Sequence, residues 1–301
     1  MKFFTYIRSL VLLSLPLIGG HIAQILIGVG DTLIVGRYSS EALAALVLGT
    51  TIFFVIFIFG AGFSFAAMAL ISTANTEDDT TKIRRITRMA LWLSLAFGLV
   101  VSPFFVFSEW LLLLLGQEAN LAVLASRYLI FAGIAIFPAL GSSVLRCYLA
   151  GMEHVKVTFY ISIIAVLLNL LINSLLVFGL LGLPELGIIG AGVATVFVNL
   201  FMFISFLFYA KIKLPNHNLF VRFWKPDHGA IGLVLKMGSA IGITSLAEAG
   251  LFSASSIMMG WVGQLELAAH GIALQLASIT FMLHLGLSDA ATIKVSAALG
   301  K

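Results

Sequence analysis

Eight long apolar stretches dominate the sequence and restrict the folds that it can adopt. An α-helix rises about 1.5 Å per residue, so about 20 apolar residues cross the roughly 30 Å hydrocarbon core of a bilayer. Hydrophobic residues make up 61% of the chain and charged residues only 10%, whereas about a quarter of a soluble domain is charged. We therefore predict an all-α integral membrane protein with about eight transmembrane helices. They cover residues 10–36, 42–74, 86–108, 121–149, 157–180, 188–210, 232–261 and 267–298.

The basic residues indicate how these helices cross the membrane, because Lys and Arg resist translocation and gather in cytoplasmic loops. With the N-terminus inside, fifteen of the 17 Lys and Arg residues fall on the cytoplasmic side, and only Arg37 and Arg127 fall outside. The sequence therefore predicts a multi-pass protein of the cell inner (plasma) membrane with both termini in the cytoplasm. The same distribution explains the net charge of +4 without a nucleic-acid partner.

The beginning of the chain recurs, without gaps, 224 residues later. The segment FIFGAGFSFAAMALISTA from Phe57 aligns with FMLHLGLSDAATIKVSAA from Phe281, and small residues keep their register through the alignment. Internal duplication of this kind is typical of membrane transporters. The repeat therefore predicts a transporter built from two related units.

The longest polar connection, residues 211–230, lies close to the repeat offset. We therefore divide the chain into a first six-helix lobe (1–210), a cytoplasmic linker (211–230) and the start of an incomplete second lobe (231–301). We expect the linker to be a solvated tether at the membrane surface, with contact between its basic residues and anionic headgroups as the alternative. A full second copy needs about four more helices after Lys301, unless a shorter second unit is complete.

Asp31 is a charged residue within the first apolar stretch, where an unpaired charge is costly and indicates function. Asn169 and Asn173 are four residues apart in the fifth stretch and share one helix face. With Thr195 in the sixth stretch, they are expected at nearly the same depth as Asp31. These four residues predict a cation or proton coupling site. Asp31, Asn169 and Asn173 would supply oxygen ligands for sodium, and interhelical hydrogen bonding is the alternative role.

Glu248 lies near the middle of the seventh stretch, at the position that the repeat matches to Gln24. An acid that faces the interior of a bundle can hold a proton, a metal ion or a cationic substrate. We therefore predict a substrate site or a second cation site at Glu248. Gly28, Gly30 and Pro16 offer places where the first helix can bend, so that cation binding at Asp31 would change the packing of this helix and release substrate outward.

Other polar residues in the apolar stretches are weaker candidates. We expect Asp289 to pair with Lys294 or with a basic neighbour, and Arg146 to extend toward the headgroups. His270 and His284 are fourteen residues apart, too far for one metal site, so we expect these histidines and His21 to be packed and hydrogen-bonded. The sequence contains no paired catalytic acids, zinc-spaced histidines, nucleophile motif or nucleotide-binding loop. We therefore expect neither an enzyme nor a cofactor.

Several motifs together resemble one transporter family. The segment SLPLIGGHIAQILIGVGDTLIVGRYSSEALAAL, with Pro16, Asp31-Thr32 and Gly36-Arg37, is similar to the first helix of the multidrug and toxic compound extrusion (MATE) transporters. The paired asparagines followed by PELGIIGAGVAT look like helices five and six of that family. AAHGIALQLASITFML with GLSDAATIKVSAALG looks like its helix eight. The resemblance covers the whole chain, and Asn173 with Glu248 points to the NorM-like branch.

The resemblance implies a secondary active antiporter that exports organic cations or drugs in exchange for sodium ions or protons. It places Asp31, Asn169, Asn173 and Thr195 in the cation-coupling site of the first lobe, and Glu248 in the cation or substrate region of the second. Family members have about twelve helices, so this chain resembles a member truncated after about eight. We expect the protein at full length to be a monomer. The alternatives are a lipid or lipid-linked oligosaccharide flippase of related architecture and an inactive truncated fragment.

Overall fold

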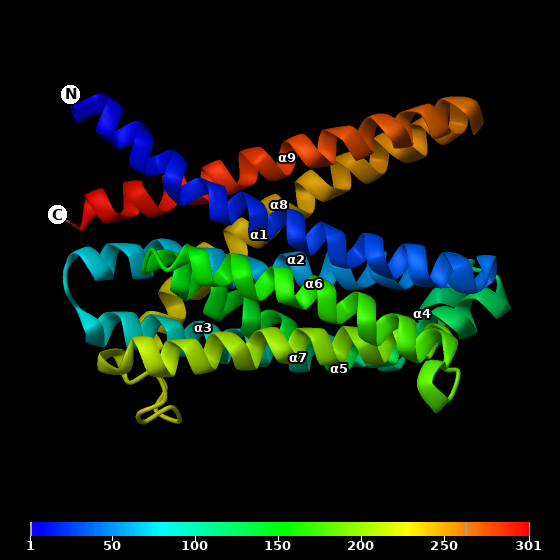
Figure 1. Ribbon diagram of the computed structural model, residues 1–301, viewed down its shortest axis with the longest axis horizontal. Coiled ribbons are helices and arrows are strands. Elements are labelled where there is room, and N and C mark those ends of the chain that lie inside the picture. The colour runs from blue at the N-terminus through cyan, green and yellow to red at the C-terminus, as the bar shows by residue number, and fades with distance from the viewer. Residues whose placement is uncertain (1, 263, 301) are drawn as a thin grey trace.

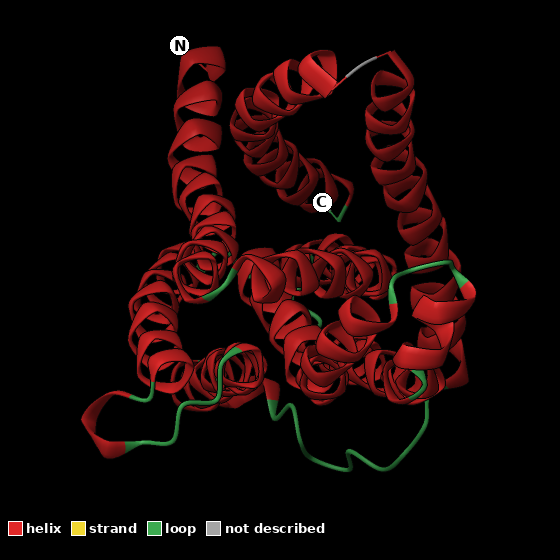
Figure 2. Ribbon diagram, turned by 90° about the vertical axis from the view of Figure 1, so that its right-hand side faces the viewer, coloured by secondary structure: helices red, strands yellow, loops and turns green. Residues whose placement is uncertain are grey.

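The computed structural model describes residues 2–262 and 264–300, which are helical almost throughout and contain no strand (Figure 2). Eight long helices correspond to the eight predicted stretches, and most extend beyond them by a few residues. This confirms the all-α prediction. The long helices are α1 (Lys2–Tyr38), α2 (Ser40–Thr76), α3 (Thr80–Val106), α5 (Ala119–Gly151), α6 (Val155–Phe178), α7 (Ile188–Lys213), α8 (His228–Val262) and α9 (Gln264–Leu299). Three short elements lie between them, α4 (Ser108–Leu114), η1 (Leu180–Gly182) and η2 (Pro215–His217).

Local sequence explains where several helices begin and end. The Ser39 hydroxyl accepts a hydrogen bond from the Ala42 amide at 3.0 Å, and the Asp79 carboxylate accepts one from the Lys82 amide at 2.9 Å. Such N-caps satisfy amides that a helix leaves without a carbonyl partner. Gly179 ends α6 with φ +66°, a conformation that glycine adopts without steric cost. These caps allow consecutive helices to reverse direction within a few residues.

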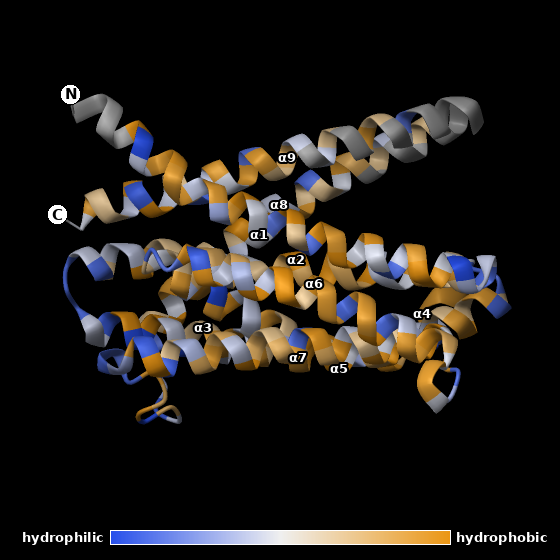
Figure 3. Cartoon of the chain, viewed as in Figure 1, coloured by the Kyte–Doolittle hydropathy of each residue, from blue (hydrophilic) through white to orange (hydrophobic). Residues whose placement is uncertain are grey.

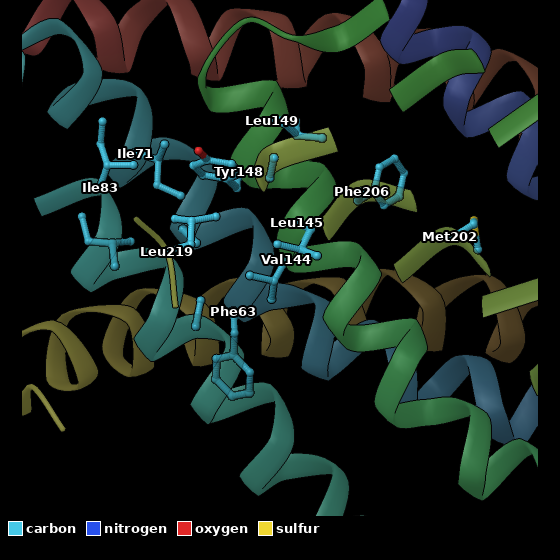
Figure 4. Packing of buried hydrophobic residues seen from close by; sticks show 14 of the residues in the cluster. Phe63, Ile71, Ile83, Val144, Leu145, Tyr148, Leu149, Met202, Phe206 and Leu219 are labelled. Atoms are coloured by element: carbon cyan, nitrogen blue, oxygen red, sulfur yellow. The ribbon is translucent and has the colours of Figure 1, made fainter. Parts of the chain in front are cut away.

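Helices α1 to α7 lie side by side as a bundle (Figure 1). The central helix is α5, which contacts α2, α3, α4, α6 and α7. Its buried Val144, Leu145 and Tyr148 pack against Phe63 of α2 and Phe206 of α7 in the largest hydrophobic cluster (Figure 4). We call the end of the bundle that holds the start of α1, the α2–α3 turn and the α5–α6 turn the basic end. The α1–α2 turn and residues 179–187 lie at the opposite end.

Helices α8 and α9 form a hairpin on one side of the bundle, with α8 against α2 and α3 and α9 against α1 and α2. Small residues allow this close approach, because a Cβ atom on Gly242 would lie 2.8 Å from the Phe59 carbonyl oxygen of α2. The hairpin contacts the bundle in its basic half and diverges from it toward the opposite end (Figure 1). The two chain ends lie at the same end of the molecule, as an even number of spans requires.

The connection between α7 and α8 differs from the predicted solvated tether. The Arg88 guanidinium of α3 donates hydrogen bonds to the carbonyls of Val221 at 2.9 Å and Arg222 at 2.8 Å. The Trp92 indole donates another to the Phe223 carbonyl at 3.0 Å. Most residues of the connection are exposed, but basic and aromatic side chains of α3 also hold it by its backbone, which the prediction of a solvated tether did not include.

Seven helices of the described residues are long and apolar enough to cross a membrane, namely α1, α2, α3, α5, α6, α7 and α8. Hydrophobic residues cover their sides, and hydrophilic residues gather toward the ends of the bundle (Figure 3). Large apolar side chains such as Leu99 and Leu167 are more than half exposed. Contact with lipid explains this exposure, because hydrocarbon solvates apolar side chains as well as a protein core does.

Candidate functional site

Asp31 lies where α1 approaches α6 closely. A Cβ atom on Gly30 would lie 2.7 Å from Leu170 Cδ2 and 3.3 Å from Asn169 Oδ1. A larger residue at position 30 would therefore displace the Leu170 side chain. The structure assigns Gly30 a packing role at the site, whereas the sequence predicted it as a place to bend.

The Asp31 carboxylate accepts two hydrogen bonds from α6. Asn169 Nδ2 lies 2.9 Å and Asn173 Nδ2 lies 2.5 Å from Asp31 Oδ1. Asp31 is 6% exposed, and both asparagines are completely buried. Because positions four apart share a helix face, the two amides reach the same carboxylate from successive turns. Three of the predicted site residues are thus in direct contact.

The same two amides leave their oxygens without a partner. Among the described residues, neither Asn169 Oδ1 nor Asn173 Oδ1 has a hydrogen-bond donor, although both atoms are buried. A buried acceptor without a donor costs about 1–3 kcal/mol, and a cation or a water molecule beside these atoms would relieve that cost. A carboxylate with two amide oxygens is the type of donor set that hard cations prefer.

The composition of the site limits which cation it suits. The described residues contain no group of three or more His, Cys, Asp or Glu side chains placed to hold a metal ion. Asp31 brings one negative charge, and its neighbours are neutral amides. One charge matches a monovalent cation such as sodium, or a proton, better than a divalent metal.

Thr195 on α7 does not contact the Asp31 carboxylate through a hydrogen bond of its own, because its hydroxyl donates to the Ala191 carbonyl at 2.9 Å. Tyr128 of α5 interacts with both, through a hydrogen bond with Thr195 and electrostatically with Asp31. Tyr128 is 2% exposed. Tyr128 was not among the predicted site residues. The one indication in the sequence was a hydroxyl group within an apolar stretch.

The remaining predicted residues lie apart from this cluster. Glu248 is on α8 and is exposed, with no hydrogen bond to Asp31 or its amides. Gly28 is also exposed, and a Cβ atom there would meet nothing within 4 Å. Pro16 lies inside the continuous helix α1, where its ring removes one backbone hydrogen bond.

The weaker candidates find partners within the protein. Asp289 bonds His21 at 2.8 Å, whereas Lys294 pairs with Glu153 at 2.7 Å. His270 lies 3.2 Å from the Ser255 hydroxyl, and His284 bonds the Thr280 carbonyl of its own helix at 2.8 Å. Asp289 therefore pairs with a basic residue as expected, but the partner is His21, which is 268 positions away in the sequence, and not Lys294.

The sequence matches relatives of one transporter family along its whole length. The family model described as MatE matches residues 16–175 and 240–301. A probable multidrug resistance protein NorM from Agrobacterium fabrum is 44% identical over 302 residues, covering 100% of this chain and 65% of the relative. A second, from Rhizobium meliloti, is 42% identical and covers 98% of this chain and 64% of the relative. The chain thus spans about two thirds of the length of the curated relatives that it matches.

Solved structures show the same fold at lower sequence identity. A MATE crystal structure in a bent conformation superposes with a TM-score of 0.86 at 21% identity, over 97% of this chain and 65% of that one. A MOP superfamily transporter from Pyrococcus furiosus, described as having a binding pocket of reversed polarity, gives a TM-score of 0.80 at 22% identity, over 97% and 65%. The family model and these relatives show that the chain belongs to the MATE family of membrane transporters, which are not enzymes.

Proposed function

We propose that this chain acts in a secondary antiporter that exports organic cations or drugs in exchange for sodium ions or protons. The observation that carries the proposal is the Asp31 carboxylate beside two buried amide oxygens without donors. The relatives described as probable multidrug resistance proteins support the export of drugs. The acids Asp31 and Glu248 favour cationic cargo, whereas a flippase for lipids or lipid-linked oligosaccharides would need a basic cavity for anionic headgroups.

The coupling step follows from the chemistry of the amides. Without a cation, Asn169 and Asn173 direct their NH₂ groups to the Asp31 carboxylate. When a sodium ion arrives, rotation of either amide turns its oxygen toward the ion. When a proton arrives instead, the carboxyl O–H can donate to an amide oxygen. Either event replaces the hydrogen bonds that join α1 to α6, and thereby changes how the two helices pack.

The arrangement of the hairpin supports an outward-open conformation. By the distribution of basic residues, the basic end faces the cytoplasm, and the hairpin contacts the bundle in that half. Toward the other end, Leu251 and Met258 of α8 are 70% and 58% exposed. In the proposed cycle, a cation that enters from outside binds Asp31, substrate leaves outward, and the helices then close on that side. Glu248, on the diverging part of α8, would meet the cationic substrate.

Dye export by cells tests the proposal. Cells that produce the chain, with any reading frame that continues downstream of residue 301, should retain less fluorescent cationic dye than cells without it. Asp31→Asn should abolish this difference, because the amide cannot carry the coupling charge. Glu41→Gln is the matched control, since Glu41 is an exposed acid in the first turn of α2, and it should leave export unchanged. Export that survives Asp31→Asn at equal protein levels would refute the proposal.

Glu248 has a separate test. Glu248→Gln should raise the dye concentration needed for half-maximal export, or change its dependence on the coupling ion, because it removes a charge from the route of a cationic substrate. An unchanged dose response would assign Glu248 a structural role and would leave the proposal for Asp31 intact.

A further inference from the structure

A second buried pair of ionisable residues joins the α8–α9 hairpin to the bundle. His21 Nε2 of α1 lies 2.8 Å from Asp289 Oδ2 of α9. His21 is 6% exposed and Asp289 is 7% exposed. The pair is far along α1 from Asp31 and takes no part in the cation site described above. Buried acids in membrane helices are costly without a partner, so each of these residues depends on the other.

The surroundings of the pair leave room for little else. A small cavity of about 20 Å³ adjoins it, which is enough for one water molecule. Arg146 and Cys147 of α5 line this cavity and are the ionisable groups that face the pair from that helix. The facing residues of α2 and α6, which are Phe65, Met68 and Thr158, carry no charge. An open pair would therefore leave Asp289 with only Arg146 nearby as a counter-charge.

Other contacts of α9 lie at the same end of the molecule. Ser72 of α2 donates to the Ile293 carbonyl at 2.7 Å, and Thr73 donates to the Ser296 carbonyl at 3.0 Å. Gly286 lies against α1, where a Cβ atom would come within 2.7 Å of the Ile18 amide nitrogen. His21 and Asp289 are the two ionisable residues buried within this contact.

We propose that His21 and Asp289 form a latch that holds the cytoplasmic side closed while the transporter is open to the outside. The inference rests on the proposed function, because alternating access requires these helices to separate in another state. The carboxylate of Asp289 strengthens the latch, since a hydrogen bond to a charged acceptor is stronger than one between neutral groups. When α9 leaves α1, the two side chains part, and water or Arg146 must then stabilise Asp289.

Pulsed electron spin resonance measures the latch without any transport. Cys147 is the single cysteine, so Cys147→Ala gives a background without thiols. Spin labels at Lys211→Cys and Leu299→Cys then report the distance between α7 and α9, since both positions are exposed and lie at the basic end of their helices. The measurements use the 301-residue chain in lipid nanodiscs. The unaltered latch should give one narrow distance distribution.

Changing the latch should open the basic end. His21→Ala and Asp289→Ala should each add a longer-distance population several times larger than that of the background chain. The exchanged variant H21D/D289H should restore the narrow distribution, because it re-forms the pair in reverse. Asp289→Asn, which keeps volume and an acceptor but removes the charge, should give an intermediate population and serves if the alanine variants do not fold. His284→Ala is the matched control, since His284 bonds its own helix.

Two results would overturn the latch. One is an unchanged distance distribution in folded His21→Ala and Asp289→Asn proteins, and the other is an exchanged variant that stays open. These outcomes are independent of dye export, which tests Asp31. Loss of the latch with intact Asp31-dependent export, or an intact latch with no such export, would therefore tell the two proposals apart.

Discussion

At Asp31, two amide N–H groups stabilise a buried carboxylate while the oxygens of the same amides remain without donors. A purely structural hydrogen-bond network would satisfy every member, because a partly satisfied buried network is destabilising. The cost is about 1–3 kcal/mol per unpaired acceptor. We infer that a bound cation recovers this cost, so the site should be more stable when occupied.

Asn169→Leu tests this at the scale of one residue. The change removes one donor to Asp31 and one free oxygen while keeping a similar volume. A stabilising ion raises the midpoint of thermal unfolding as its concentration increases. We expect sodium, exchanged for choline at constant ionic strength, to raise the midpoint of thermal unfolding in the wild type. The variant should need at least ten times more sodium for the same rise.

Asn199→Leu is the control, because the Asn199 amide donates to the Thr195 carbonyl of its own helix at 2.9 Å. It should keep the response to sodium. If sodium does not raise the midpoint of the wild type, the result favours a proton as the coupling ion. A sodium response that is equal in wild type and Asn169→Leu would contradict the role of the amide.

His217 gives a second prediction at this scale. It lies in η2, is 6% exposed and bonds the Tyr148 hydroxyl through Nδ1 at 2.6 Å. Burial, together with the charge of nearby His154, lowers the pKa of His217 below its usual 6.5. The unfolded chain therefore binds a proton first as the pH falls below about 6.5, and the folded state loses stability through that range. Above that range the contribution is fully present.

We accordingly expect wild-type thermal stability to decrease from about pH 7 to about pH 5, and to decrease less in His217→Gln, which cannot titrate. Tyr148→Phe should lower stability across the whole range, because it removes the hydrogen bond and keeps the ring. Parallel stability curves for wild type and His217→Gln would show that the histidine does not contribute to the pH dependence.

Contacts between individual residues were the hardest part to predict from the sequence. The depth of Asp31, Asn169 and Asn173 could be predicted, because residue counts along straight helices fix it and the asparagines share a face. Tyr128 could not, since no helical period identifies which hydroxyl turns toward an acid on another helix. The pairing of His21 with Asp289 depends on the tilt of α9 against α1, which the sequence does not encode locally.

At the scale of elements, backbone contact between α2 and α8 fixes the hairpin against the bundle. A Cβ atom on Gly62 would meet the Gly238 carbonyl and lie 2.7 Å from the Gly242 amide nitrogen. Backbone atoms cannot rotate away as a side chain can. Gly62→Ala must therefore separate the helices, and overpacking of this kind costs about 1–3 kcal/mol.

Thermal unfolding in detergent should show a lower midpoint for Gly62→Ala. Gly250→Ala, on the same α8, is the control, because a Cβ atom there meets nothing within 4 Å. It should be neutral or stabilise by up to about 1 kcal/mol through helix propensity. Equal effects of the two changes would contradict the close approach of α2 and α8.

The second important contact between elements is the one that holds the α7–α8 connection against α3. Arg88→Leu removes the donors that hold the carbonyls of Val221 and Arg222. Hydrogen bonds from a charged group contribute about 1.5–3 kcal/mol, so the connection should detach. Trypsin, which cuts after Arg222, should then cleave the connection several times faster than in wild type.

Arg84→Leu removes a guanidinium one helical turn away and should leave cleavage at the wild-type rate. If Arg88→Leu is cleaved no faster than wild type, the connection is held by something other than Arg88.

The long helices themselves were predictable, because hydrophobic length fixes them. The docked connection was not, since its polar composition is equally typical of a solvated loop and the bonds go to its backbone.

For the whole molecule, the α8–α9 hairpin packs against the bundle at the basic end and diverges from it toward the opposite end. The division into lobes 1–210 and 231–301 remains a prediction, as do the cytoplasmic placement of the ends and the coupling ion. The internal repeat predicted a transporter, and the family membership confirms it. The relative placement of hairpin and bundle could not be predicted, because it depends on close contacts such as Gly62 with Gly238, which no local sequence pattern specifies.

Export from proteoliposomes under an imposed gradient tests the coupling of cation entry to substrate release most directly. The chain, with any downstream reading frame, is reconstituted with a fluorescent cationic dye, and an inward sodium gradient or an inward proton gradient is applied separately. We expect one gradient to drive dye movement in wild type and in Glu41→Gln, and neither gradient to drive it in Asp31→Asn at equal reconstitution. Equal gradient-driven rates in wild type and Asp31→Asn would contradict the central role of Asp31.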